Sequence, residues 1–312
     1  MDECSLYEFD IEPSEDDERL DAYLNEQFAD LSRSYISKVI KNGGCLVNDV
    51  IVTKAGFRLS VDDHVCFQLP AAIEPDIQPE DIPLDILYED DDLLIVNKPQ
   101  GMVVHPAAGH FSGTLVNAIM WHCRGNLSGV NGVMRPGIVH RIDKDTSGSL
   151  VICKNDIAHH SVAEQLKVHS INRIYYAIIH GHPATPSGTI HKPIGRDPSN
   201  RLKMAVCAEG KGKDAITHYE VVEELKGYSL IKCKLETGRT HQIRVHMSSI
   251  HHPILGDPLY ETGFSNPFEH LQGQCLHAAT IGLNHPKTGE YLEVTAPMPE
   301  YFAHLLDILR NK

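Results

Sequence analysis

The side chains best suited to chemistry lie in residues 140–148, which read His-Arg-Ile-Asp-Lys-Asp-Thr-Ser-Gly. In an extended chain, residues two apart point to the same side, so Arg141 and Asp143 are expected to lie together. A nearby guanidinium keeps a carboxylate ionised, as a nucleophile or a general base requires. The alternative is a surface ion pair at the corner between two strands.

Short apolar runs at residues 137–139 and 149–153 flank this stretch and are typical of strands. We therefore expect a loop between two strands, with a turn at residues 146–148. Asp145 raises a competing possibility, because a pair of carboxylates is the catalytic apparatus of glycoside hydrolases.

Two further segments carry side chains of catalytic type. Residues 235–246 read Leu-Glu-Thr-Gly-Arg-Thr-His-Gln-Ile-Arg-Val-His and place two arginines and two histidines on a turn that opens a helix. Residues 173–181 read Arg-Ile-Tyr-Tyr-Ala-Ile-Ile-His-Gly and indicate a strand. The alternative role of a tyrosine on such a strand is packing in the core.

The three segments, in this order, resemble the RluA family of RNA pseudouridine synthases, and the resemblance covers roughly residues 85–300. Shorter matches lie at residues 96–99, 104–106, 113–117, 135–137, 193–197 and 253–257. The resemblance implies an α+β fold with a mixed, largely antiparallel sheet and a central catalytic cleft. It also implies an isomerase that converts uridine to pseudouridine without a cofactor.

Carried over onto this chain, the resemblance makes Asp143 the catalytic carboxylate, Tyr175 the aromatic side chain beside the target base, and Arg244 the ion-pair partner of Asp143. Arg141 would fill the stack that the flipped uridine leaves, as a planar cation can. Arg173 stands where the family usually has lysine. The carboxylate can attack the anomeric carbon or remove the 2′ proton to give a glycal, and the sequence leaves both routes open.

Further residues of these segments and of a basic stretch at residues 192–213 are expected to contact the substrate. They are His140, Thr146, Arg196, Lys203, Arg239, His241 and Val245. The alternative for the basic stretch is an ordinary solvated hairpin. Gly256 and Asp257 are interpreted as turn residues.

The formal net charge of −14 by itself argues against a nucleic-acid partner. However, residues 1–17 carry eight acids and residues 71–92 carry nine, and neither segment has a lysine or an arginine. The rest of the chain therefore has a net charge of −14 + 17 = +3, which is compatible with RNA binding.

Residues 18–70 show a second, smaller pattern. Apolar residues at helical spacing predict one helix in residues 20–28 and a second helix that begins after Ser32 as its N-cap. Residues 45–52 indicate a hairpin that turns at residues 48–49.

This pattern resembles the αL-type RNA-binding module found in a small-subunit ribosomal protein and in tyrosyl-tRNA synthetase. The usual Gly-Asp before the last strand is Asp62-Asp63 here, a departure that affects the last turn. Arg33, Lys38 and Lys41 on the second helix are expected to contact RNA. The alternative is a helical cap with no RNA-binding role.

The chain is thus expected to have four parts. They are an acidic disordered tail (1–17), the RNA-binding module (18–70), a stiff linker rich in proline and acids (71–84), and the catalytic domain (85–312). In the catalytic domain we predict helices at residues 157–168, 240–250 and 300–310, and strands at 93–96, 149–153, 174–179, 229–235 and 276–283.

Several classes of protein are not supported by the sequence. No apolar run reaches the ~20 residues that span a bilayer, and the acidic N-terminus lacks a signal peptide, which predicts a cytoplasmic protein. The eight cysteines are scattered and are expected to be reduced. The motifs of zinc proteases, dinucleotide and Walker sites and α/β-hydrolases do not occur, so neither a metal nor a cofactor is expected.

We therefore expect an isomerase that flips uridines out of structured RNA and converts them to pseudouridine. The additional module most resembles the arrangement in enzymes of large-subunit ribosomal RNA, which indicates a role in ribosome biogenesis. Transfer RNA is the second candidate substrate. A non-catalytic RNA-binding assembly factor is the alternative of a different class. No obligate protein partner is evident, and a monomer is expected.

Overall fold

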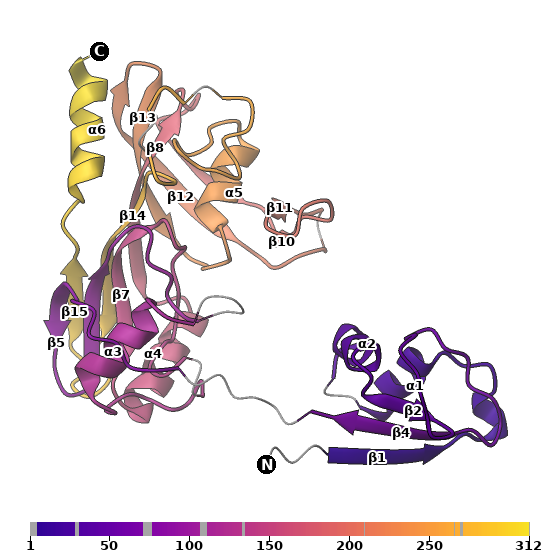
Figure 1. Ribbon diagram of the computed structural model, residues 1–312. Coiled ribbons are helices and arrows are strands. Elements are labelled where there is room, and N and C mark those ends of the chain that lie inside the picture. Colours follow the sequence, from indigo (N-terminus) through magenta and orange to yellow (C-terminus); the bar gives the residue numbers. More distant parts are fainter. Residues whose placement is uncertain are drawn as a thin grey trace. The chain divides into compact units, whose positions relative to one another are not determined.

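The computed structural model describes residues 5–28, 31–70, 77–106, 111–132, 135–208, 210–264, 266–268 and 271–311. The chain forms two compact units, residues 1–74 and residues 75–312 (Figure 1). Within the described ranges, no helix is both long enough and apolar enough to cross a membrane.

The N-terminal unit is a four-stranded antiparallel sheet with strand order β1-β4-β2-β3 and two helices. Its elements are β1 Ser5–Asp10, α1 Leu20–Gln27, α2 Arg33–Lys41, β2 Cys45–Val47, β3 Val50–Ile51 and β4 His64–Leu69. The apolar residues of both helices are buried against the sheet, with Leu20, Leu24, Ile36 and Ile40 completely inaccessible.

Local sequence explains the turns of this unit. The hydroxyl of Ser32 accepts a hydrogen bond from the Tyr35 amide at 3.3 Å and caps α2, as predicted. Asn48 and Asp49 have positive φ angles of 50° and 64°, which allow the tight turn of a two-residue hairpin. Asp62 takes a φ of 67°, so an aspartate adopts the left-handed conformation here and the last turn keeps its form.

The prediction of a disordered tail is wrong for residues 5–17, of which residues 16–17 form a turn. Ser5–Asp10 form β1, which pairs with β4 along its whole length, and a 3-10 helix follows at Pro13–Glu15. This acidic segment also contains two aromatic residues, Tyr7 and Phe9, which both pack edge-on against Phe28. Their ring centroids lie 4.8 and 6.0 Å from that of Phe28, respectively. This packing and the strand pairing offset the repulsion among the acids. Residues 1–4 lie outside the described part.

The second unit, residues 75–312, contains the predicted catalytic domain and is called the catalytic unit below. It is built on a nine-stranded sheet with strand order β5-β6-β7-β14-β8-β13-β12-β9, and β15 pairs with β14. Only the β7–β14 pair is parallel, so the sheet is mixed and largely antiparallel, as predicted. The strands are β5 Ile86–Glu89, β6 Leu93–Lys98, β7 Ser147–Cys153, β8 Asn172–His180, β9 Ser187–His191, β12 Ile216–Leu225, β13 Tyr228–Leu235, β14 Leu276–Asn284 and β15 Tyr291–Thr295. A separate hairpin consists of β10 Ile194–Arg196 and β11 Met204–Val206.

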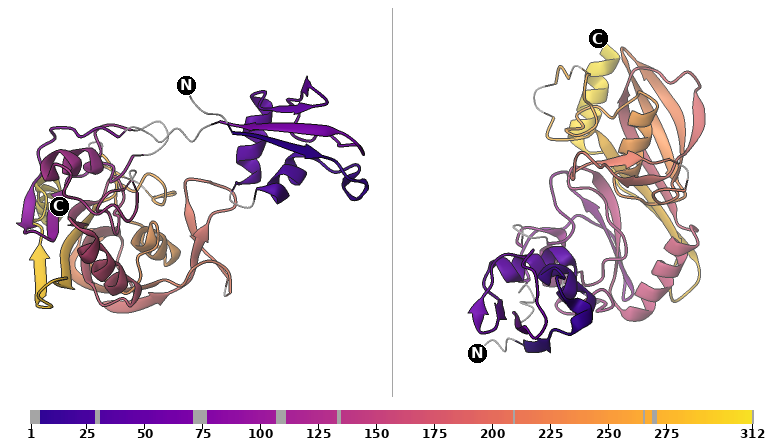
Figure 2. Two further views of the ribbon diagram at one scale, coloured as in Figure 1. Left: turned by 90° about the horizontal axis from the view of Figure 1, so that it is seen from below. Right: turned by 90° about the vertical axis from the view of Figure 1, so that its right-hand side faces the viewer.

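Four helices cover the sheet (Figures 1 and 2). They are α3 Leu115–Cys123, α4 Asp156–Lys167, α5 Gln242–Ser249 and α6 Glu300–Asn311. Alternate residues of β6 and β7 pack with α3 and with α4, so these strands are buried on both faces. This explains their continuous apolar sequences. The other half of the sheet packs against α6 through β8 and β13. The predictions for α4, α5 and α6 are confirmed, whereas α3 was not predicted.

The predicted linker at residues 71–84 is too long. Residues 71–76 lie outside the described part, but Ile77 is 3% exposed and packs in the core with α3. The Glu80 amide donates a hydrogen bond to the carbonyl of Asn117 at 3.0 Å, and the Glu80 carboxylate accepts one from the Gly113 amide. The segment from Ile77 onward therefore belongs to the catalytic unit, because Ile77 fills its core and Glu80 is hydrogen-bonded to it.

Candidate active site

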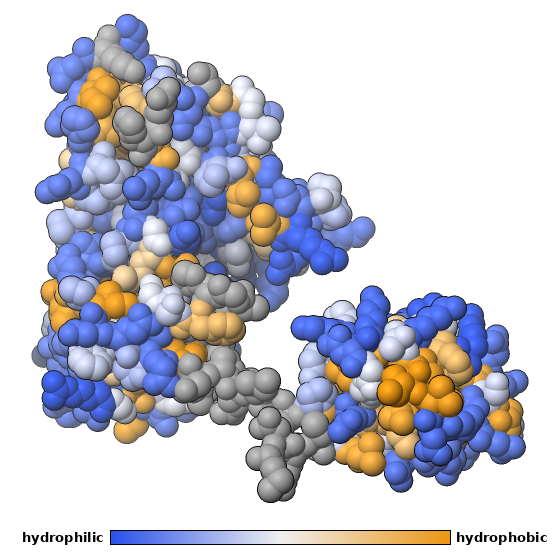
Figure 3. Space-filling model, viewed as in Figure 1, coloured by the Kyte–Doolittle hydropathy of each residue, from blue (hydrophilic) through white to orange (hydrophobic). Residues whose placement is uncertain are grey.

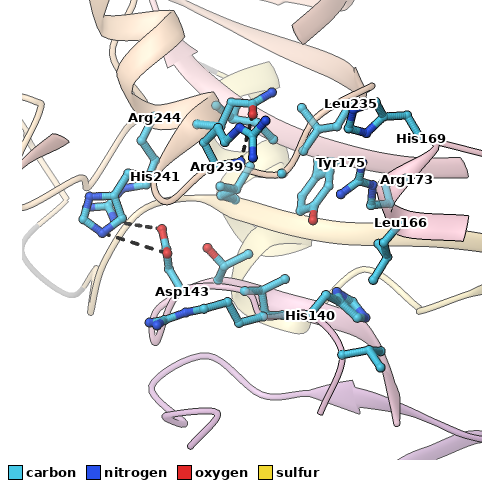
Figure 4. Close-up of a pocket in the computed structure, with 18 of the residues that line it drawn as sticks. His140, Asp143, Leu166, His169, Arg173, Tyr175, Leu235, Arg239, His241 and Arg244 are labelled. Carbon is cyan, nitrogen blue, oxygen red and sulfur yellow. Dashed lines mark hydrogen bonds and ion pairs between the residues drawn. The ribbon is translucent and has the colours of Figure 1, made fainter. Parts of the chain in front are cut away.

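A pocket of about 620 Å³ opens in the catalytic unit between the loop before β7, the end of α4, β8 and the start of α5 (Figure 4). This volume lies within the ~300–1,000 Å³ typical of small-ligand sites. Asp143, Tyr175 and Arg244 all line it, so the structure brings together residues that lie up to 101 positions apart in the sequence.

The loop that carries Asp143 leads into the one parallel strand pair of the sheet. Gly148 has a φ of 113°, and a Cβ atom there would collide with the backbone of Ala278 on β14. Glycine therefore permits the close approach of β7 and β14 directly after the loop. The predicted turn at residues 146–148 is wrong, because Ser147 and Gly148 already belong to β7 and the turn lies at residues 144–145. The predicted strand at 137–139 is a single bridge from Ile138 to Ile152.

Lys98, the last residue of β6, is hydrogen-bonded to the same loop. Its side chain is completely buried, and Nζ donates hydrogen bonds to the carbonyls of Pro99, Met102 and Lys144 at 2.8, 2.8 and 2.9 Å. Burial lowers the pKa of Lys98 to about 7, although the charges of Asp145 and Asp143 oppose the shift. The sequence analysis noted residues 96–99 as a match but gave Lys98 no role.

Replacing Lys98 with methionine should leave three buried carbonyls without a donor. We expect the catalytic unit to lose about 3 kcal/mol of stability and its activity to fall at least about tenfold, because the Asp143 loop loses its anchor. Urea unfolding followed by the emission of Trp121, the single tryptophan, reports this unit alone. Lys287→Met, at an exposed position of the same unit, is the control. Equal unfolding midpoints for the two variants would contradict the anchoring role.

Arg244 on α5 links two carboxylates. Its Nη1 donates a hydrogen bond to Asp143 Oδ2 at 2.9 Å, while Nε and Nη2 donate to the two oxygens of Asp257 at 2.6 and 2.9 Å. Burial alone would lower the pKa of Arg244, but the hydrogen bonds and charges of Asp257 and Asp143 raise it overall. Arg244 therefore stays charged and fixes one oxygen of Asp143.

Asp257 is a second residue whose role the sequence analysis missed. Its interpretation as a turn residue holds in part, because Oδ1 accepts hydrogen bonds from the amides of Leu259 and Tyr260. Its side chain is completely buried and also binds Arg244 in a bidentate pair. The match at residues 253–257 was the available signal, but it did not identify the partner.

Tyr175 and two histidines complete the surroundings of Asp143. Burial raises the pKa of Tyr175, which keeps its hydroxyl protonated at neutral pH. Burial lowers the pKa of His241, whose Nδ1 lies 2.9 Å from the Tyr260 hydroxyl and whose Nε2 lies 3.9 Å from Asp143. Burial and the charge of Arg173 lower the pKa of His140 to about 3. The neutral His140 accepts a hydrogen bond from the Val151 amide through Nε2, which fixes the loop to β7.

The charges on the pocket wall suit an anionic substrate. Its cationic side chains are Arg141, Lys167, Arg173, Arg239 and Arg244. Asp143 is the one carboxylate among the described residues that line it. The pocket thus attracts polyanions although the whole chain has a net charge of −14.

Comparison with known proteins agrees with this geometry. Residues 92–249 match the RNA pseudouridylate synthase family, and residues 18–65 match the S4 domain. A Bacillus subtilis protein named uncharacterized RNA pseudouridine synthase YlyB is 48% identical over 98% of this chain and 99% of its own length. The chain belongs to the RNA pseudouridylate synthase family. It is an isomerase, and its N-terminal unit is an S4 RNA-binding domain.

Other relatives support the family and the fold. A Zymomonas mobilis protein named ribosomal large subunit pseudouridine synthase D is 48% identical over 93% of each chain. A Neisseria meningitidis serogroup B protein of the same name is 43% identical over 94% of this chain and 79% of its own. The structure of human RNA pseudouridylate synthase domain containing 1 superposes with a TM-score of 0.57 at 25% identity, over 74% of this chain and 96% of that one.

Of the other residues predicted to contact the substrate, some line the pocket and some do not. Arg141, Thr146 and Arg239 line the pocket. Val245 is 4% exposed and packs in a core cluster with Tyr260, so the prediction that it contacts the substrate is wrong. Ile243, two residues earlier on α5, lines the pocket instead.

Arg196 and Lys203 lie at the two sides of the loop between β10 and β11, on a projection that is largely hydrophilic in Figure 3. Lys203 also lies over the ring of Tyr260, with Nζ 5.8 Å from its centroid. The guanidinium of Arg244 lies 5.1 Å from the same centroid. Tyr260 therefore lies between Lys203 of the basic hairpin and Arg244 of the pocket.

The predicted contacts of the S4 domain lie on α2. Lys38 and Lys41 are exposed in its last turn, where they are free to face RNA. Arg33 instead pairs with the buried Asp21, at 3.1 and 3.0 Å. Burial raises the pKa of Asp21, but hydrogen bonds from Arg33 and Arg19 lower it to about 2. Arg33 therefore stabilises the fold of the S4 domain through its ion pair with Asp21.

Two groups of side chains in the described part could hold a metal ion, and neither lines the pocket. They are Glu8, His64 and Cys66 in the S4 domain, and Asp90, Asp92 and His285 in the catalytic unit. Both already contain internal hydrogen bonds: His64 pairs with Asp10, and Asp90 accepts from Tyr88 at 2.6 Å and lies 2.7 Å from His285.

Proposed function

We propose that this synthase converts uridines of large-subunit ribosomal RNA to pseudouridine, with Asp143 as the reacting carboxylate. One observation supports the assignment of Asp143: it is the one acidic residue among the described pocket residues. Arg244 binds its Oδ2, while its Oδ1 lies 3.9 Å from His241 Nε2. Two relatives that match both domains are named ribosomal large subunit pseudouridine synthase D, which supports the choice of RNA.

In the proposed reaction the target uridine leaves its stack at a cost of about a few kcal/mol, and Arg141 takes its place. The uracil then lies against Tyr175 with its sugar at Asp143. The carboxylate attacks the anomeric carbon or removes the 2′ proton, and the N1–C1′ bond breaks with its electron pair on the uracil. The uracil turns, and C5 bonds to C1′ as the C1′–carboxylate bond breaks or, in the glycal route, as Asp143 returns the 2′ proton to C2′. C5 then loses its proton and N1 gains one.

The glycosidase alternative loses support because its second carboxylate is not in the pocket. Asp145 lies two residues from Asp143 but does not line the cavity, and it packs close to Gly273. A glycosidase needs two carboxyl groups about 5–10 Å apart across the scissile bond.

The choice of RNA can be tested with transcripts that carry tritium at uracil C5. Large-subunit ribosomal RNA and a transfer-RNA mixture are incubated separately with the synthase, and tritium release is followed under limiting enzyme. We expect kcat/KM for the ribosomal RNA to exceed that for transfer RNA at least about tenfold, as for specific sites. A preference for transfer RNA would overturn the proposed substrate. No release from either RNA would favour the non-catalytic binding factor.

Deleting residues 1–74 tests the role of the S4 domain. Because the pocket lies wholly in residues 75–312, we expect tritium release at saturating RNA to stay within about threefold. The Kd for ribosomal RNA should rise about tenfold, because the tethered module and its phosphate contacts are lost. Filter binding and single-turnover release measure the two quantities. A truncated chain that still unfolds cooperatively by Trp121 emission but is inert would contradict the modular account.

A further inference from the structure

Two arginines on the pocket wall have opposite surroundings. Arg244 is 4% exposed and binds two carboxylates. Arg173 is 7% exposed, and among the described residues it has no carboxylate partner. The single hydrogen bond that its side chain makes to the described residues runs from Nη2 to the carbonyl of Glu236 at 2.7 Å, and Nε is buried without an acceptor. Burial lowers the pKa of Arg173; Tyr175 raises it, whereas Arg239 lowers it further.

An unpaired buried cation is costly, and proteins normally avoid it. Its presence on a pocket wall indicates that a negative charge arrives with the substrate. Gly238 leaves room for the guanidinium, because a Cβ there would lie 2.6 Å from Arg173 Nη1. Gly238 thus leaves free the space that the guanidinium occupies.

Position identifies which part of the substrate meets Arg173. Arg173 and Tyr175 are two residues apart on β8 and face the same pocket, and Tyr175 lies between Arg173 and Asp143 in Figure 4. A uracil placed against Tyr175, with its sugar at Asp143, therefore directs its far edge toward Arg173. That edge carries O4, the atom opposite to N1.

We propose that Arg173 is a catalytic residue that donates a hydrogen bond to a uracil carbonyl and takes up the negative charge that leaves with the base. When the N1–C1′ bond breaks, the electron pair on N1 is delocalised onto O2 and O4. A half-turn about the N3–C6 axis then exchanges N1 with C5 and O2 with O4. The guanidinium thus meets a carbonyl oxygen both before and after the rotation. Fixed donors aimed at developing charge are typically worth ~10²–10³ in rate.

This inference rests on the proposed placement of Asp143 and Tyr175. Its test distinguishes a failure of the inference from a failure of that placement. In single turnovers with saturating synthase, Arg173→Gln should slow N1–C1′ cleavage about 100-fold. Arg173→Lys, which keeps the charge, should stay within about tenfold. The Kd for RNA should change less than about threefold. An active parent enzyme and an inactive Asp143→Asn variant in the same assay show that the proposed site itself is correct.

RNA that carries 5-fluorouridine supplies the deciding comparison. Fluorine stabilises the departing uracil anion, so the deficit of Arg173→Gln should shrink at least about fivefold with this RNA, as followed by nuclease digestion and chromatography. In urea, the Trp121 transition of Arg173→Gln should lie at or above that of the parent, because an unpaired cation has been removed. A deficit that is equal for both bases, a loss confined to RNA affinity, or a marked fall of the urea midpoint would overturn the proposal.

Discussion

Asp143→Asn is expected to lower tritium release from C5-labelled RNA by at least about 10³-fold while the Kd for RNA stays within about tenfold. The change is isosteric, so it keeps the shape of the loop and one oxygen for Arg244. It removes the charge that the carboxylate needs to attack the sugar or to accept its proton. RNA affinity should persist because phosphate contacts dominate it.

Asp145→Asn is the matched control for this result. Asp145 is an acid of the same loop, but it does not line the pocket, so its amide variant should keep activity within about threefold. If both variants lost activity equally, the two-carboxylate mechanism would regain support. If Asp143→Asn lost RNA affinity in parallel with activity, a binding role would explain Asp143 better than a chemical one.

Asp257→Asn is expected to have the second largest effect. It leaves the buried Arg244 guanidinium with a neutral partner, and breaking a buried pair typically costs ~3–5 kcal/mol. Urea unfolding followed by Trp121 emission should show a loss of about 3 kcal/mol. Activity should fall about 100-fold, because Arg244 no longer holds Asp143 in place.

A surface ion pair provides the control for Asp257. Asp307 pairs with Arg310 one turn away on α6 and is 68% exposed, so Asp307→Asn should cost less than about 0.5 kcal/mol. An Asp257→Asn variant that matched Asp307→Asn in both stability and activity would show that Asp257 is only the turn residue that the sequence indicated.

Much of the fold follows from sequence patterns, and the failures have physical causes. Strands β6 and β7 were found because burial on both faces makes them continuously apolar. Helix α3 was missed because residues 115–123 are apolar on nearly every side, which leaves no helical periodicity to detect. Strand β1 was missed because its acids resemble those of a disordered segment, while pairing with β4 decides its structure.

For the site, the sequence indicated which residues matter but not how they are paired. Asp143, Tyr175 and Arg244 were identified by resemblance, and the structure places all three on one pocket. Asp257 gained its role only through a contact with α5, and Arg173 only through the absence of an acid among the described residues around it. Such pairing depends on tertiary structure, which residue spacing does not encode.

The most direct test of the central claim is a pseudouridine map of total RNA from cells that lack this protein and are supplied with either the parent chain or Asp143→Asn at equal abundance. The account predicts that pseudouridines disappear from large-subunit ribosomal RNA without the protein and return with the parent chain alone. Return of the same positions with Asp143→Asn would contradict it.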